Sequence, residues 1–354
     1  MIISRTPFRI SFFGGGTDYP AWYRQNGGAV LAATIDKYCY LTCRYLPPFF
    51  EHRFRLVYSK IENCQTADEI QHPVVREALR LNGIQRGLEI HHDGDLPARS
   101  GMGSSSAFSV GLLHALHALQ GRMVNKRRLA AESIHLEQEV LNETVGSQDQ
   151  VMAAYGGLNH IAFDVSGEIT VRPVVLKSER KEELNSHLML YYTGIKRTAS
   201  EVASSYVPDI HRRGRQLKRM SQLVERGLEV LAGEGDLGDF GKLLHEAWVA
   251  KSSLSPHVSN STIDQIYEEA LSAGALGGKL LGAGGGGFIL LFVRPSEQAL
   301  VKQRLDSLVR VPFEFESSGS QIVFFSAERD YHAEDMARSE GKLKVFRELS
   351  DIAA

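Results

Sequence analysis

A serine-rich loop near residue 100 carries the clearest chemistry in this chain. Residues 96–107 read Leu-Pro-Ala-Arg-Ser-Gly-Met-Gly-Ser-Ser-Ser-Ala, and the apolar helical run Ala107–Leu119 follows directly. Glycine lets the backbone come close to a ligand, and the first turn of a helix presents free N–H groups at its positive dipole end. The loop therefore predicts an anion site, although a plain helix cap fits the pattern equally well. It is not a Walker A loop, because no Gly-Lys-Ser/Thr follows the glycines.

A second glycine turn lies close to the start of the chain. Residues 7–20 read Pro-Phe-Arg-Ile-Ser-Phe-Phe-Gly-Gly-Gly-Thr-Asp-Tyr-Pro, so that a strand carrying Arg9 runs into three glycines and then Asp18. A short carboxylate on a glycine turn suits the recognition of hydroxyl groups, because it accepts several hydrogen bonds. A turn in which Asp18 binds only its own backbone is the alternative interpretation.

A third glycine-rich stretch spans residues 277–288 and reads Gly-Gly-Lys-Leu-Leu-Gly-Ala-Gly-Gly-Gly-Gly-Phe. Gly282, Gly284 and Gly287 satisfy G-x-G-x-x-G, but a strand and not a helix follows, without a surrounding βαβ unit. We therefore reject NAD binding. So many small residues in a row indicate that a ligand or another backbone segment packs very closely there.

Composition narrows the class of protein. The 354 residues are 43% hydrophobic and 23% charged with a net charge of −2, which argues against nucleic acid as a partner. No apolar run is long enough to span a membrane, and no signal peptide is visible. The three cysteines match no zinc spacing, so we expect buried thiols and a cytoplasmic protein.

The periodicity predicts an α+β protein of two domains, 1–180 and 181–354, because some strands follow one another directly while helices separate others. The charged run 179–183 is interpreted as a surface linker between them. Helical periodicity is continuous over 199–231. The expected strands are 2–13, 28–45, 54–59, 88–92, 157–163, 188–193, 287–293, 311–316 and 321–325. The other expected helices are 67–82, 104–119, 126–141, 240–252, 261–273 and 296–309.

The three motifs together, in this order, resemble the GHMP kinases, a family that includes galactokinase, homoserine kinase and mevalonate kinase. The resemblance implies an N-terminal domain of the ribosomal-protein-S5-like fold, a C-terminal ferredoxin-like domain and an active site between them. It also implies ATP as phosphoryl donor, with Mg²⁺. By this resemblance the phosphates of ATP are held by Pro97, Ser100, Gly101, Met102, Gly103, Ser104, Ser105 and Ser106.

The resemblance also implies a sugar substrate. Arg9, Thr17, Asp18 and Tyr19 match the galactokinase pattern, but the Glu-His pair that helps to grip the sugar there is replaced by two glycines. The form Gly-Gly-Gly-Thr-Asp-Tyr-Pro is most similar to members that phosphorylate D-glycero-D-manno-heptose 7-phosphate on its anomeric hydroxyl, on the way to nucleotide-activated heptose. The shorter side chains would make room for a longer sugar.

A fourth segment carries the expected catalytic groups. A glutamate twelve residues before Asp-Gln in galactokinases corresponds to Glu137 before Asp149. The register of mevalonate kinase, eleven residues, would land on Gln138, and Glu139 is a further possible metal ligand. Mg²⁺ needs few protein oxygens, so Ser105 and Glu137 suffice. Asp149 would accept the proton of the sugar hydroxyl and Arg9 would steady the transferred phosphoryl group; a helix cap is the alternative role for Asp149.

Further contacts are expected from the second half of the chain. Lys196 and Arg197 are the candidates for the substrate's own phosphate, because Arg binds phosphate in bidentate fashion and Lys adds a point charge. Gly284 and Gly285 are expected near the substrate. The alternatives are a 1-kinase for fucose or galactose, and a catalytically silent sensor of sugar and nucleotide. The expected partners are ATP and a sugar phosphate, with a homodimer as the expected assembly and with no nucleic acid or membrane.

Overall fold

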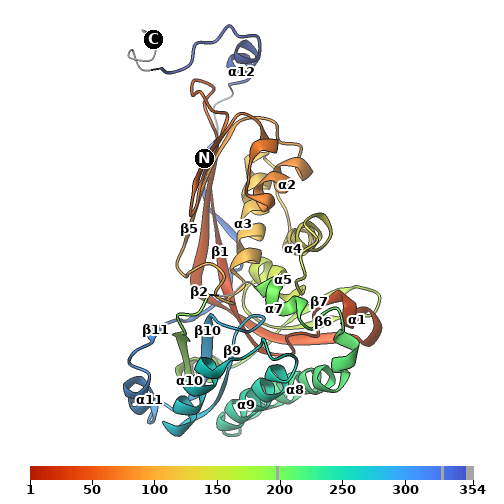
Figure 1. Cartoon of the computed structure of the whole chain (residues 1–354), viewed down its shortest axis with the longest axis vertical. Coiled ribbons are helices and arrows are strands. Elements are labelled where there is room, and N and C mark those ends of the chain that lie inside the picture. Colours follow the sequence, from red (N-terminus) through yellow and green to blue (C-terminus); the bar gives the residue numbers. More distant parts are fainter. Residues whose placement is uncertain (197–198, 328–330, 348–354) are drawn as a thin grey trace.

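The computed structural model describes residues 1–196, 199–327 and 331–347, which form two β-sheets with their covering helices (Figure 1). The larger sheet contains nine strands in these residues: β1 (Ile2–Phe13), β2 (Gly28–Tyr45), β3 (Phe54–Val57), β4 (Ile61–Cys64), β5 (Leu88–Gly94), β6 (Leu158–Phe163), β7 (Ile169–Pro173), β12 (Phe315–Glu316) and β13 (Gln321–Phe325). The smaller sheet contains β8 (Leu188–Tyr192), β9 (Ala275–Leu280), β10 (Phe288–Val293) and β11 (Val309–Val311).

The described helices are distributed along the whole chain. Those of the first half are α1 (Pro20–Asn26), α2 (Pro73–Leu81), α3 (Ser104–Leu119), α4 (Lys126–His135), α5 (Gln148–Tyr155) and α6 (Ser178–Ser186). Those of the second half are α7 (Ala199–Ser204), α8 (Gly214–Ala232), α9 (Gly238–Ser252), α10 (Ser261–Ser272), α11 (Gln298–Arg304) and α12 (His332–Ser339). Three short helical segments complete the set: η1 (Ala67–Glu69), η2 (Leu136–Val140) and η3 (Ile210–Arg213). Among the described helices none is long and apolar enough to cross a membrane.

The long strands β1 and β2 form the centre of the larger sheet. They pair antiparallel along most of their length, β5 pairs with the second half of β2, and β6 pairs with its first half. The sheet order is β13-β1-β2-β5-β3-β4, in which only the β3–β5 pair is parallel. Strands β12 and β13 return from the end of the chain to this sheet. The domain boundary near residue 180 stays a prediction.

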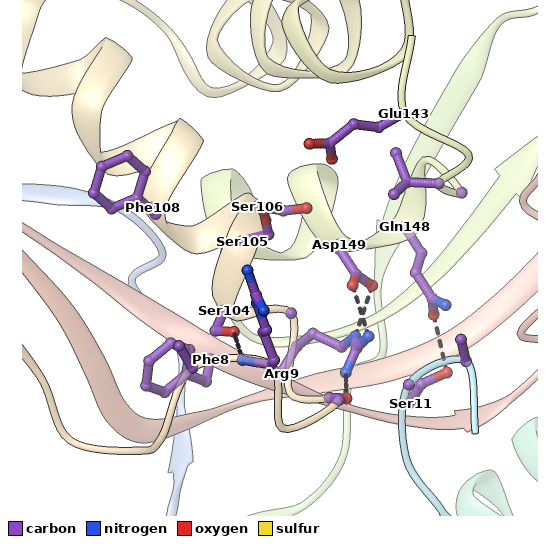
Figure 2. Close-up of a pocket in the computed structure, with 18 of the residues that line it drawn as sticks. Phe8, Arg9, Ser11, Ser104, Ser105, Ser106, Phe108, Glu143, Gln148 and Asp149 are labelled. Atoms are coloured by element: carbon purple, nitrogen blue, oxygen red, sulfur yellow. Dashed lines mark hydrogen bonds and ion pairs between the residues drawn. The ribbon is translucent and has the colours of Figure 1, made fainter. Parts of the chain in front are cut away.

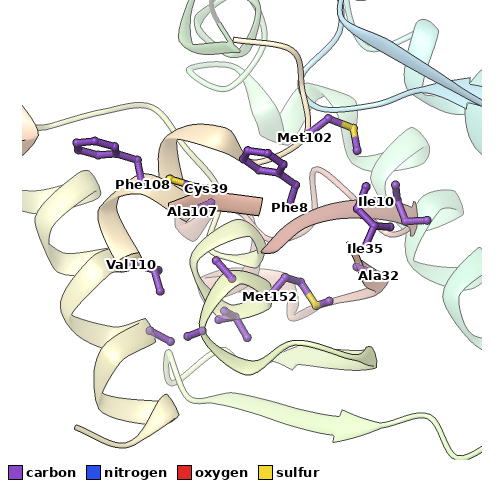
Figure 3. Close-up of a cluster of buried hydrophobic side chains, with 14 of the residues drawn as sticks. Phe8, Ile10, Ala32, Ile35, Cys39, Met102, Ala107, Phe108, Val110 and Met152 are labelled. Atoms are coloured by element: carbon purple, nitrogen blue, oxygen red, sulfur yellow. The ribbon is translucent and has the colours of Figure 1, made fainter. Parts of the chain in front are cut away.

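Helix α3 is the central element of the N-terminal core. It contacts β1 and β2 on one side and α2, α4 and α5 on the others (Figure 1). For this reason its residues are apolar almost all round, as expected for a helix covered by neighbours. Figure 3 shows side chains of β1, α3 and α5 in one buried hydrophobic cluster, in which Ile10 lies beside Ile35; the cluster includes Phe8, Ala107, Val110 and Met152. Burial of each large side chain contributes roughly 1.5–3 kcal/mol, which anchors the first turn of α3 against the end of β1.

The mixed strand and helix order confirms the predicted α+β class. Three local predictions were wrong. The strand expected over 311–316 is split, because β11 ends at Val311 in the smaller sheet and β12 begins at Phe315 in the larger one. The charged run 179–183 lies in helix α6, because Leu184 is fully buried there and the charged side chains occupy the outer face. The helix expected over 199–231 breaks into α7, η3 and α8, and Pro208 lies at the break; proline lacks the N–H that a continuous helix needs. The strand β9 was not predicted, because its glycines hide the pattern.

Candidate functional site

A large cavity of about 1100 Å³ lies where the three glycine-bearing segments meet. Its walls come from the end of β1 and the turn after it, from the serine-rich loop, from the start of α5 and from the turn between β9 and β10. These segments are remote in the sequence. A cavity of this size exceeds what one small metabolite needs and can hold a nucleotide beside a second substrate.

The serine-rich loop forms one wall and ends at the N-terminus of α3. Gly103 is the N-cap in the left-handed conformation with φ +75°, and Gly101 has φ +80°, a region that other residues rarely adopt. Ser104, Ser105 and Ser106 follow as the first turn of α3. Five of the predicted phosphate contacts line the cavity, namely Gly101, Gly103, Ser104, Ser105 and Ser106. The other three do not: Pro97 is exposed, while Ser100 and Met102 are buried behind the loop.

The late glycine turn is packed against the serine-rich loop. A Cβ on Gly282 would lie 2.5 Å from the Cα of Gly101, and one on Gly287 would lie 2.1 Å from the carbonyl oxygen of Ser100. The N–H of Phe288 also donates to this carbonyl at 3.1 Å. Backbone packing therefore explains why so many small residues stand in a row, and it means that the turn braces the loop from behind.

Arg9 and Asp149 form a bidentate ion pair inside the cavity (Figure 2). The Nε and Nη2 of Arg9 each donate to one carboxylate oxygen of Asp149 at 2.7 Å. The Nη1 of Arg9 donates to the carbonyl oxygen of Gly101, also at 2.7 Å. The Arg9 side chain is 4% exposed and that of Asp149 is 24% exposed, so that the carboxylate still faces the cavity. The structure thus brings the two predicted catalytic residues together at the phosphate loop.

Asp18 occupies a tight site beside this pair. Its carboxylate accepts from the main-chain N–H of Gly16 at 2.8 Å and of Gln148 at 3.3 Å. Burial and the nearby charge of Asp149 raise the pKa of Asp18. Asp18 lines the cavity, but Thr17 does not: its hydroxyl donates to the carbonyls of Gly14 and Ala29. Thr17 therefore holds the shape of the turn, while Asp18 faces the cavity.

Two tyrosines close this end of the cavity. Tyr19, which was predicted, and Tyr206, which was not, line the cavity in edge-to-face contact with ring centroids 6.3 Å apart. Burial raises the pKa of the Tyr206 hydroxyl to about 12 and that of Tyr19 well above its ordinary value, so both remain protonated donors. No motif marks Tyr206 in the sequence, because it reaches the site from the segment after α7.

Glu137 is fully buried behind the first turn of α3. It lies in η2, a stretch of π-helix that continues α4, and such π-turns are frequent at functional sites. Its Oε2 accepts from the hydroxyl of Ser106 at 2.9 Å and from the amide of Gln150 at 2.5 Å. Burial raises the pKa of Glu137 to about 7. The predicted metal partner Ser105 lies instead on the exposed side of the turn, facing the cavity.

The oxygen atoms of Ser105 and Glu137 are of the kinds that bind a magnesium ion. The Oε1 of Glu137 is buried without a hydrogen-bond partner, and hydroxyl and carboxylate oxygens are the ligands that Mg²⁺ takes. Two other residues were considered for the metal. Glu139 is 70% exposed and pairs with His135, and the side chain of Gln138 donates to the backbone carbonyl of Val145. A further carboxylate, Glu143, lines the cavity on the side of Ser106 and Asp149 (Figure 2).

Several other predicted substrate contacts lie away from the cavity. Lys196 is exposed and does not line it, and Arg197 lies outside the described residues. Gly284 lines the cavity, whereas the N–H of Gly285 donates to the carbonyl of Val258 at 2.8 Å. The predicted role of Lys196 in binding a phosphate stays a prediction.

An aromatic wall at the opposite end of the cavity was not predicted. The ring of Phe108 stacks on His72 with centroids 4.9 Å apart, His92 meets its edge at 5.1 Å, and Tyr58 meets His72 at 5.1 Å. Burial lowers the pKa of both histidines, which keeps their rings neutral. Such a surface suits a flat heterocyclic base. The sequence holds no signal for it, since the four residues come from four separate segments.

Two family models match this chain. Residues 69–157 match the family described as GHMP kinases N terminal domain, and residues 227–310 match GHMP kinases C terminal. The D-glycero-alpha-D-manno-heptose 7-phosphate kinase of Campylobacter jejuni is 27% identical over 325 residues, which cover 84% of this chain and 91% of that protein.

Two further relatives bear on the substrate and on the fold. The bifunctional fucokinase/GDP-fucose pyrophosphorylase of Arabidopsis thaliana is 26% identical over 85% of this chain and 30% of that protein. The crystal structure of a D-glycero-D-manno-heptose 1-phosphate kinase from Bacteroides thetaiotaomicron has a TM-score of 0.76 at 23% identity, covering 92% of this chain and all of that one. At this identity the structural likeness establishes the fold.

Proposed function

Because the chain belongs to the GHMP kinase family, we propose that it transfers the γ-phosphoryl group of ATP to the anomeric hydroxyl of D-glycero-D-manno-heptose 7-phosphate. Membership of the family makes the protein a phosphotransferase with an alcohol group as acceptor. The heptose 7-phosphate kinase of Campylobacter jejuni, which matches along most of both chains, supports the proposed substrate. The product would be the 1,7-bisphosphate, an intermediate toward nucleotide-activated heptose.

The observation that carries the proposal is the position of the Arg9–Asp149 pair. Arg9 of this pair donates to the carbonyl of Gly101 in the serine-rich loop. Both members of the pair line the cavity beside Asp18. Phosphoryl transfer needs little covalent chemistry from the protein; it needs positioning and charge neutralisation. A carboxylate beside the acceptor and a guanidinium beside the phosphoryl group supply both.

The nucleotide would occupy the end of the cavity that holds the serine-rich loop and the aromatic wall. The free N–H groups at the start of α3 and the hydroxyls of Ser104 and Ser105 face the cavity as donors to phosphate oxygens. The Phe108–His72 stack offers a flat surface to the adenine base. Lys60 and Arg99 line the same end as further cations.

The sugar would bind beside Asp18, Tyr19 and Tyr206. The carboxylate of Asp18 accepts hydrogen bonds from sugar hydroxyls, and the tyrosine hydroxyls donate to ring or hydroxyl oxygens. Gly15 leaves open the space that a longer side chain would fill, since its Cβ would have its nearest neighbour 3.5 Å away, whereas a Cβ on Gly16 would lie 3.1 Å from Leu217.

In the reaction the anomeric hydroxyl gives its proton to Asp149, and its oxygen forms a bond to the γ-phosphorus while the bond to the bridging oxygen of ADP breaks. Arg9 orients the carboxylate of Asp149 through its two hydrogen bonds. Ser105 and Glu137 are the residues that we expect to hold Mg²⁺, which supplies positive charge to the phosphates of ATP when it is bound.

An assay of ADP release with ATP and Mg²⁺ tests the proposal. The panel contains heptose 7-phosphate, the same heptose without phosphate, fucose and galactose, and ³¹P NMR identifies the phosphorylated position. We expect the highest kcat/KM for heptose 7-phosphate and a new phosphate on the anomeric carbon. Turnover of fucose or galactose alone would favour the alternative, which the Arabidopsis relative supports. ATP binding without any turnover would indicate a sensor. Because the reaction consumes ATP, we infer a cytoplasmic location; the homodimer stays a prediction.

A further inference from the structure

Two buried lysines form part of the cavity wall on the side of the smaller sheet. Lys251, near the end of α9, is 6% exposed, and Lys279, in β9, is 2% exposed; both line the cavity. Removal of an ammonium group from water costs several kcal/mol unless an opposite charge compensates it. Within the described residues neither lysine forms an ion pair with a carboxylate.

The partners of both lysines are neutral backbone carbonyls. The Nζ of Lys251 donates to the carbonyl of Leu280 at 2.7 Å and to that of Gly282, and the Nζ of Lys279 donates to the carbonyl of Phe12 at 3.0 Å. An ammonium group has three N–H donors, so one on Lys251 and two on Lys279 stay available to a ligand. The carbonyls orient the two groups but leave their charges uncompensated.

The charged groups that face the two lysines come from three other segments. They are Arg9 of β1, Asp18 of the turn after it, and Asp149 of α5. Asp149 already binds Arg9 with both oxygens, and Asp18 accepts from backbone N–H groups. Three basic side chains therefore face two carboxylates that already have other partners. Burial lowers the pKa of Lys279 to about 7 and that of Lys251 well below its ordinary value, as expected where a counter-anion is missing.

The position of the pair indicates which anion it would bind. Lys60 and Arg99 belong to the nucleotide end, beside Tyr58 and Ser104. Lys279 contacts the strand end that leads into the turn of Asp18, which is the proposed sugar site. Lys196, predicted for this role, does not line the cavity.

We propose that Lys251 and Lys279 form the binding site for the phosphate group that the sugar substrate already carries. This inference rests on the proposed function. Charge-assisted hydrogen bonds from two buried ammonium groups favour a phosphate over a neutral hydroxymethyl group, so the pair would make the enzyme selective for a phosphorylated sugar. The two lysines would bind the substrate without taking part in the transfer.

The test compares two sugars in the Lys251→Met and Lys279→Met variants. With heptose 7-phosphate, we expect kcat/KM to fall roughly 10- to 100-fold in each variant, the usual cost of a lost hydrogen bond to a charged group. With the same heptose lacking its phosphate, kcat/KM should stay within about threefold, as should KM for ATP. Lys242→Met is the matched control, because Lys242 lies on the same helix α9, is 66% exposed and pairs with Asp239. It should behave as the wild type with both sugars.

Each other outcome overturns a different statement. Equal losses on both sugars would mean that the lysines serve the transfer or the packing of the glycine turn, and would refute the inference, as would a selective loss in Lys196→Ala alone. A marked fall in the thermal midpoint of both methionine variants would also assign them a structural role. A wild-type enzyme that does not distinguish the two sugars would instead contradict the proposed substrate.

Discussion

A single arginine aligns two parts of the site, because Arg9 binds both oxygens of Asp149 at 2.7 Å and the carbonyl of Gly101 at the same distance (Figure 2). Arg9 and Asp149 are 140 positions apart in the chain. The contact holds the carboxylate of α5 in register with the phosphate loop, in a rigid fork that a lysine could not reproduce. The predictions for the reaction centre follow from this pair.

Asp149→Asn should leave a folded protein that binds ATP and sugar nearly normally but turns over at least about 100-fold more slowly. Asparagine keeps the size of the side chain and one hydrogen-bond acceptor for Arg9. Its amide cannot act as the general base that takes the proton of the sugar hydroxyl. Rapid-quench or steady-state kinetics measure kcat, and thermal unfolding checks the fold. Ser147 and not Asp149 is the N-cap of α5, so the helix-cap alternative for Asp149 was wrong. A variant with near-normal kcat would refute the role of Asp149 as the base and leave it as a partner that orients Arg9.

Gly101→Val and Gly103→Val should abolish ATP binding. A Cβ on Gly101 would lie 2.7 Å from the carbonyl of Leu281, and one on Gly103 would lie 3.3 Å from the Cγ of Arg9. Gly121→Val is the matched control: its φ of +70° gives a similar backbone strain, but no atom lies within 4 Å of its Cβ. Calorimetric titration with ATP distinguishes them. If both loop variants fold and bind ATP with unchanged affinity, the phosphates of ATP do not bind at this loop.

Glu137→Gln should raise the concentration of Mg²⁺ needed for half-maximal activity and slow turnover, because a carboxylate is replaced by a neutral amide. Glu139→Gln serves as the comparison, since that side chain is 70% exposed and contacts His135. Titration of activity with Mg²⁺ at saturating ATP provides the measurement. If Glu139→Gln produces the larger effect, Glu139 holds the metal and the galactokinase register is wrong.

The stability of the protein should depend on pH through Lys279. Between about pH 7 and pH 10.5 the unfolded chain keeps a proton that the folded lysine has released, so the free energy of unfolding rises with pH over this window. Lys279→Met removes this term. The gain in stability of the variant over the wild type should therefore be largest near pH 7 and below, and should shrink as the pH rises. Denaturant unfolding at several pH values measures it, and a gain that grows with pH would contradict the assignment.

The sequence alone determined the family, the α+β class and those candidate site residues that lie within one short motif. The serine-rich loop ahead of α3, the turn that carries Asp18 and the spacing of Glu137 from Asp149 are all local patterns, because a loop, a turn and a helical offset need few residues to specify them. The predicted elements were right for β1, β2 and α3, but the continuous helical periodicity over 199–231 missed the break at Pro208. They failed at α6, where one buried leucine decides the structure, and at β9, where glycine carries no pattern.

Only the tertiary structure decided which residues share the cavity. Four residues that share no sequence motif line the same cavity: Tyr206, Phe108, Lys251 and Lys279. They come from the segment after α7, from α3, from α9 and from β9. Burial is a property of the folded state as well: nothing in the sequence shows that the two lysines lose contact with water, whereas Lys196 remains exposed. Local order therefore specified the serine-rich loop, and long-range packing specified which residues lie across the cavity from it.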